Sequence, residues 1–75
     1  MKFRTQDGEV LEAESLRQLA EILWQTKFIP EPTLEDWMRG SAKRAAMWDG
    51  SVIRTCSPEA HVEDLIAAGF LTRIE

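Results

Sequence analysis

The chain has 75 residues, a formal net charge of −4, 44% hydrophobic residues and 29% charged residues. This length fits one domain, residues 1–75, and the composition is typical of a folded globule rather than a disordered chain. The negative charge disfavours non-specific binding to nucleic acid or to an anionic membrane surface. The single cysteine excludes an intrachain disulfide and a multi-cysteine metal site.

The first part of the chain predicts a β-hairpin. Two strand-like runs, residues 2–5 and 9–13, flank a turn that ends in an Asp-Gly pair, which is a strong hairpin signal. A two-residue turn would place Leu11 on the opposite face from Phe3. A three-residue loop with Gly8 in the left-handed conformation would instead pair these two residues. Because a one-residue slip moves every side chain to the other face, we predict the loop that gathers the apolar groups.

A first helix is predicted to begin after Ser15 and to end near Thr26 or Lys27. Ser15 and Gln18 have the spacing of a reciprocal cap, in which each side chain binds a backbone amide of the other end of the turn. The apolar residues recur at helical spacing and form one stripe, made of Leu16, Leu19, Ala20, Leu23 and Trp24.

A connector follows this helix at residues 28–32. Its two prolines stand at alternate positions, and proline neither continues a helix nor allows the preceding residue to be helical. We therefore expect a stiff, extended connector that Phe28 and Ile29 anchor to the core.

A second helix is predicted to begin after Thr33, with Asp36 in the capping position, and to stop at Gly50. The core is the default location for the two tryptophans of this helix, Trp37 and Trp48. An exposed tryptophan would be a candidate anchor for a partner, because this residue dominates the energetics of protein interfaces. One side of the helix carries Leu34, Trp37, Met38, Ser41, Ala45 and Trp48.

Residues 51–55 are rich in β-branched side chains and are predicted as a strand. A third helix follows, with Ser57 as its cap, Pro58 in its first turn and Gly69 at its end. A terminal strand covers residues 70–74. The order is therefore β-β-α-α-β-α-β. It predicts a small α+β domain with a sheet of three or four strands and the helices packed on one face of the sheet.

Two residues have side chains that catalysis commonly uses. His61 has no second histidine with which to complete a metal site, and we expect it to lie at the surface or in an interface. Cys56 precedes the third helix, whose N-terminus can activate a thiol. The nearby carboxylates oppose that effect, so a small buried cysteine is expected. The sequence contains no recognisable catalytic triad, carboxylate pair or phosphate-binding glycine loop. We predict no enzymatic activity, no cofactor and no metal.

Arg39, Lys43 and Arg44 form the only dense basic cluster of the sequence. Arg39 and Lys43 are four residues apart and share a helical face, with Arg44 at its border. One interpretation is a helix that contacts phosphates. The other is a solvated face, because Glu35 and Asp36 precede Arg39 by four and three residues and can pair with it. A nucleic-acid-associated regulator is therefore our alternative hypothesis.

The run Arg-Ala-Ala-Met-Trp-Asp-Gly-Ser-Val-Ile-Arg-Thr at residues 44–55 is followed by Ser57 and by His-Val-Glu-Asp-Leu at residues 61–65. This pattern resembles short uncharacterised proteins of bacterial prophages and mobile elements, and the resemblance covers the C-terminal half of the chain. It implies a bacterial or phage origin and an accessory role. It transfers no catalytic residue.

Our leading hypothesis is a small non-enzymatic accessory protein that binds another protein, or a second copy of itself as a homodimer. The lack of a catalytic constellation and the surplus of large apolar side chains favour it. Residues 1–8 contain no apolar secretory core, and no apolar run approaches the about 18 residues that cross a membrane, so we expect a cytoplasmic protein without a membrane partner. The candidate contact residues are Trp37, Met38, Arg39, Lys43, Arg44 and Trp48.

Overall fold

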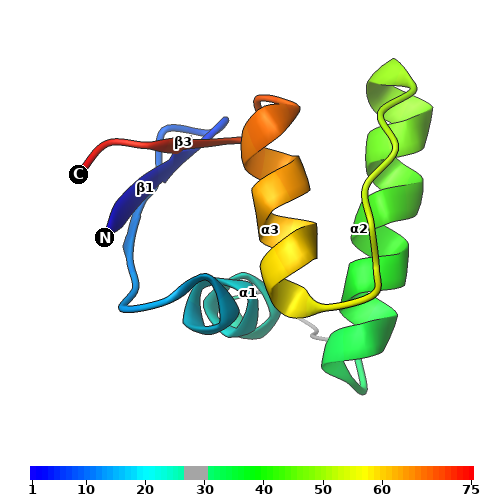
Figure 1. The fold of residues 1–75 in the computed structure, drawn as a ribbon, viewed down its shortest axis with the longest axis horizontal. Coiled ribbons are helices and arrows are strands. Elements are labelled where there is room, and N and C mark those ends of the chain that lie inside the picture. Colours follow the sequence, from blue (N-terminus) through cyan, green and yellow to red (C-terminus); the bar gives the residue numbers. More distant parts are fainter. Residues whose placement is uncertain (27–30) are drawn as a thin grey trace.

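The computed structural model describes residues 1–26 and 31–75, and these form a small α+β fold (Figure 1). The strands make one antiparallel sheet in the order β2-β1-β3, α3 packs against β3, and α1 packs against α3. In Figure 1, α3 stands next to the sheet and α2 lies farther from it. This confirms the predicted class and the three-stranded alternative. The elements are β1 (Lys2–Thr5), β2 (Val10–Glu12), α1 (Leu16–Gln25), α2 (Leu34–Asp49), α3 (Pro58–Ala67) and β3 (Leu71–Arg73).

The hairpin has the register that gathers apolar groups. Phe3 pairs with Leu11, and both side chains are buried on the face that meets the helices. The turn closes through a hydrogen bond from the Gly8 amide to the Thr5 carbonyl, 3.0 Å long. Gly8 has a φ of +87°, a left-handed conformation that a residue with a Cβ rarely adopts. The predicted three-residue loop is therefore confirmed.

The helix α1 begins and ends where the sequence predicts. The Ser15 hydroxyl accepts a hydrogen bond from the Gln18 amide, and the Gln18 side chain accepts one from the amide of Glu14 rather than that of Ser15. Thr26 caps the C-terminal end. The predicted anchoring of the connector by Phe28 and Ile29 lies outside the described residues. Where the description resumes, the Glu31 carbonyl accepts a hydrogen bond from Nε1 of Trp24, 2.8 Å away.

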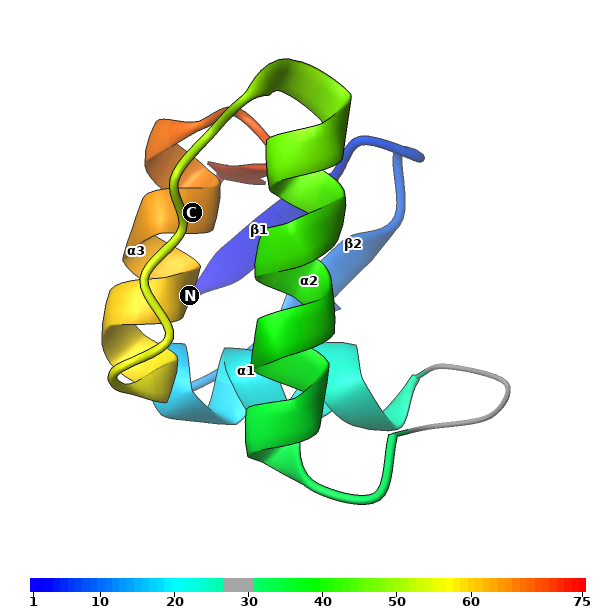
Figure 2. The same ribbon diagram turned by 90° about the vertical axis from the view of Figure 1, so that its right-hand side faces the viewer.

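The predicted strand at residues 51–55 is wrong. This segment, which we call the linker, runs from the end of α2 back along α3 (Figure 2) and belongs to no strand pair among the described residues. Its side chains still alternate, with Ile53 buried and Val52 89% exposed. A β-branched run therefore has the extended shape of a strand here, but it packs on a helix instead of a sheet. Strand propensity describes a fit to a pleated, half-buried surface and does not specify the neighbour.

The last helix and strand follow the predicted pattern. Ser57 accepts a hydrogen bond from the Ala60 amide, 3.1 Å away, and Pro58 opens α3. The helix is followed by Gly69 with a φ of +88°, and the amide of Phe70 donates to the Leu65 carbonyl at 2.9 Å. This reversal sends β3 back to pair with β1, which becomes the central strand. None of the helices in the described residues has the length and apolar character needed to cross a lipid bilayer.

Candidate functional site

An open groove of about 420 Å³ separates the C-terminal half of α2 from the rest of the fold. One wall consists of α2 residues, namely Trp37, Ser41, Arg44, Ala45 and Trp48. The opposite wall comes from the β1–β2 turn, the end of α3 and the start of β3, and includes Asp7, Leu65, Phe70 and Leu71. Most of these side chains are apolar, and the volume falls in the range of about 300–1,000 Å³ that is usual for binding sites.

The groove exists because α2 is covered over only part of its length. Its N-terminal half contacts α1, and Trp37 and Met38 are buried there. Farther along the same face, Ser41 is only partly buried and Ala45 is a small buried side chain, so this part of the helix is packed less closely. The face predicted from helical spacing is therefore real, but Trp48 at its far end lies outside the core.

Trp48 is the main correction to the sequence prediction for α2. Trp37 is 4% exposed, whereas Trp48 is 76% exposed and stands in the groove wall. Met47 and Val52, close to it in the chain, are 79% and 89% exposed. We call Met47, Trp48 and Val52 the α2 tip. Single exposed apolar residues are common on protein surfaces, so Trp48, which also lines the groove, is the one of the three that distinguishes this surface.

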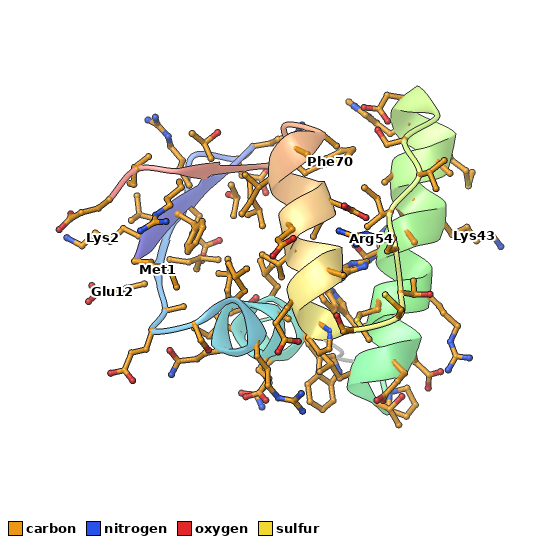
Figure 3. All side chains as sticks on the ribbon, in the orientation of Figure 1. Met1, Lys2, Glu12, Lys43, Arg54 and Phe70 are labelled. Atoms are coloured by element: carbon orange, nitrogen blue, oxygen red, sulfur yellow. The ribbon has the colours of Figure 1, made fainter. Side chains whose placement is uncertain are left out.

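The three basic residues of α2 are all exposed but have different neighbours. Arg39 pairs with Asp36, with 3.4 Å between Nη2 and Oδ1, rather than with Glu35. Lys43 points away from the body of the protein (Figure 3). Arg44 lies in the groove wall, and its guanidinium extends over Gly40 to within 4.0 Å of the Glu31 carboxylate. The stem of Arg44 thus contributes apolar surface to the groove while its charged end lies at the rim.

His61 is fully buried, so the expectation of a surface or interface histidine is wrong. Its Nδ1 lies 2.8 Å from the carbonyl oxygen of Arg54 and must carry the proton of that hydrogen bond. Its ring meets Trp37 edge-on, with 5.1 Å between the ring centroids. Its Nε2 has no hydrogen-bond partner among the described residues. Spacing of four residues from Leu65 places His61 on the buried face of α3, and this periodicity is the signal that sequence analysis underused.

Burial lowers the pKa of His61 below its ordinary value of 6.5. The hydrogen bond to the Arg54 carbonyl and the negative charge of Asp64 act in the opposite direction but are smaller. The imidazole is therefore neutral at neutral pH, and it joins α2, α3 and the linker as a packed side chain. A neutral ring held in this way has a structural role and no access to a substrate.

A second set of contacts fastens the linker to α3. The Asp64 carboxylate accepts hydrogen bonds from the backbone amide of Arg54 at 2.8 Å and from its Nε and Nη2 atoms at 2.9 and 3.0 Å. Figure 3 shows Arg54 between α3 and α2. The guanidinium lowers the pKa of the Asp64 carboxyl below its ordinary value. We call Arg54, His61 and Asp64 the clasp. Asp64 binds the amide and the side chain of Arg54, and His61 binds its carbonyl.

Cys56 is exposed, and the expectation of a buried cysteine is wrong. It lies in the bend between the linker and α3, where the alternation that buries Ile53 has ended. In residues 1–26 and 31–75, no three histidine, cysteine or carboxylate side chains gather in a way that could hold a metal ion. The groove and the α2 tip are thus the features of the described surface that carry a functional argument.

The chain matches no protein-family model, no curated protein and no solved structure. The resemblance of its C-terminal half to prophage proteins therefore stays a prediction. The function has to be argued from the groove itself.

Proposed function

We propose that this chain is a small non-enzymatic binding protein that holds an apolar segment of another protein in the groove beside α2. The observation that carries the proposal is the position of Trp48, a largely exposed tryptophan in the wall of an apolar groove. Burial of one large apolar side chain contributes about 1.5–3 kcal/mol. Tryptophan residues in such settings are the ones whose truncation weakens protein interfaces most.

The make-up of the groove supports a protein segment as its occupant. Ser41 leaves room on the α2 wall for a side chain of a partner, and the partly exposed Phe70 offers an apolar surface opposite. Arg44 places a charge at the edge. An apolar centre with a polar rim is the usual anatomy of a protein interface.

The setting of this activity is also part of the proposal. The resemblance of residues 44–65 to proteins of prophages and mobile elements supports an accessory role in a bacterial or phage system. A cytoplasmic location belongs to the same proposal. In this proposal the protein acts by occupying a partner, without performing chemistry.

Comparison of immobilised variants in an extract of the host tests the proposal. Trp48→Ala removes the anchor, and Ser41→Lys puts a long charged side chain into the groove. Val10→Ala is the matched control, because Val10 is an exposed apolar residue of β2 that does not line the groove. We expect the proteins retained by the wild type and the control to be lost from both groove variants. Retention of the same proteins by all four chains would contradict the proposal.

The alternative is a nucleic-acid-associated regulator that uses Arg39, Lys43 and Arg44. Its support is the exposure of all three side chains on α2. Against it, carboxylates stand close to Arg39 and Arg44 and reduce the charge available to phosphates. This hypothesis predicts binding to DNA or RNA that weakens steeply with salt and disappears when the three residues become alanine. Unchanged binding by the triple variant, or no binding at low salt, would eliminate it.

A further inference from the structure

We infer that the occupant of the groove is a second copy of this chain, whose α2 tip enters the groove while its own groove receives the tip of the first copy. This inference rests on the proposed function and names the partner for the same site. The result is a dimer with a two-fold axis beside the C-terminal end of α2.

The first argument is the adjacency of the inserting group and its receptor. Trp48 belongs both to the exposed α2 tip and to the wall of the groove. If a surface knob and its pocket lay on distant parts of a molecule, copies would add head to tail without closing. Because knob and pocket are neighbours here, a two-fold axis at their border brings each Trp48 to the groove of the other copy. The association then closes at two chains.

The second argument is charge complementarity. The α2 wall carries the cation Arg44, whose contact with Glu31 is long at 4.0 Å, and the opposite wall carries the exposed anion Asp7 in the β1–β2 turn. A two-fold rotation exchanges the walls, so that Arg44 of each copy can face Asp7 of the other. A groove with one charge of each sign is complementary to itself. A groove shaped for a polyanion would carry one sign on both walls.

The third argument is the space on the α2 wall. Ser41 lines the groove, is partly exposed and has a small side chain, whereas Ala45 below it is buried. Ser41 allows an indole ring from the other copy to lie close to the helix. The contact is then mainly apolar, and it should survive about 1 M salt, at which the screening length falls to about 3 Å. Each copy has a net charge of −4, and salt screens the repulsion between the two copies, so added salt should favour the dimer. Added salt would instead weaken binding to nucleic acid.

Sedimentation of the full chain between about 1 µM and about 1 mM tests the dimer. We expect the wild type and Val10→Ala to dimerise equally. Trp48→Ala and Ser41→Lys should raise the dissociation constant about 30-fold or more, the effect of losing an interface hot spot. Circular dichroism spectra of the variants should match that of the wild type, because both positions are at least partly exposed.

A charge exchange tests the symmetry of the contact at two exposed positions that do not affect the core. Arg44→Asp alone and Asp7→Arg alone each place like charges across the axis, so each variant should dimerise more weakly than the wild type. A mixture of the two variants restores both opposite-charge pairs and should form a heterodimer. Detection of this heterodimer by energy transfer between two dyes, one on each variant at Cys56, would identify both walls of the groove.

Three outcomes overturn the inference: a wild type that stays monomeric over the whole concentration range, a dimer that Trp48→Ala leaves unchanged, or a mixture of charge variants that associates no better than each variant alone. None of them contradicts the proposed function, because the groove can then hold a different protein. The comparison of host proteins retained by the groove variants decides that question separately.

Discussion

The two helices that flank the linker, α2 and α3, are held in opposite ways. In α3, Ala60, His61, Val62 and Leu65 are buried among ten residues, and the clasp fastens the linker to this helix. In α2, only Trp37, Met38 and Ala45 are buried among sixteen. The longer helix therefore has the smaller share of the core. The exposed apolar side chains near its C-terminal end contribute little to folding. We propose that a partner protein binds there.

The largest expected effect separates the two tryptophans of α2. Trp37→Ala removes a buried indole and its edge contact with His61, and should lower the free energy of unfolding by about 3–5 kcal/mol. Trp48→Ala should change it by no more than about 0.5 kcal/mol, because the side chain is mostly in solvent. Urea denaturation of both variants measures the difference. Equal losses would mean that the whole of α2 belongs to the core.

A smaller effect concerns pH and the buried histidine. The pKa of His61 is lowered in the folded state, so between the two pKa values the unfolded chain binds the proton and the folded chain does not. The contribution of neutral His61 is therefore complete above pH 6.5 and is lost as the pH falls below it toward the lowered folded value. We expect the urea concentration at the unfolding midpoint of the wild type to decrease as the pH is lowered through this window.

The matched variant for this pH dependence is His61→Leu, which keeps an apolar side chain at the position and removes the titrating group. Its midpoint should change less than that of the wild type over the same window, whatever its absolute stability. A pH dependence that is identical in the two chains would show that the histidine is not the group responsible. Asp64, whose pKa is lowered in the folded state, does not change in this window, because its contribution to stability is complete above its ordinary pKa of 3.8 and is lost only at more acidic pH.

The smallest expected effect is on amide hydrogen exchange, and it distinguishes two arginines that are both ion-paired. Arg54→Ala should speed amide hydrogen exchange in the linker, because Asp64 binds both the backbone and the side chain of that residue. Arg39→Ala removes an exposed pair of two residues in one helix and should leave exchange unchanged. Mass spectrometry of the exchanging peptides distinguishes the two. Equal protection in both variants would show that the linker is held without the Arg54 side chain.

The groove shows where sequence analysis reaches its limit. Spacing along α2 placed Trp37, Ser41, Ala45 and Trp48 on one face, and the structure confirms that face. It did not identify the opposite wall, because Asp7 and residues 65–71 lie far from α2 in the chain and only the fold brings them together. It also misplaced His61, since Glu63 and Asp64 beside it in sequence suggested a polar surface, whereas the fold packs its ring against Trp37.

The sequence by itself determined the local elements. The cap at Ser15, the turn at Gly8 and the reversal at Gly69 depend on groups within a few residues of one another, so their signals are complete in short segments. Only the tertiary structure decided that β3 pairs with β1, that residues 51–55 pack on a helix, and that α2 extends beyond the core. Burial is the physical reason. It depends on which distant surfaces meet, and a propensity or a spacing describes only one of the two surfaces.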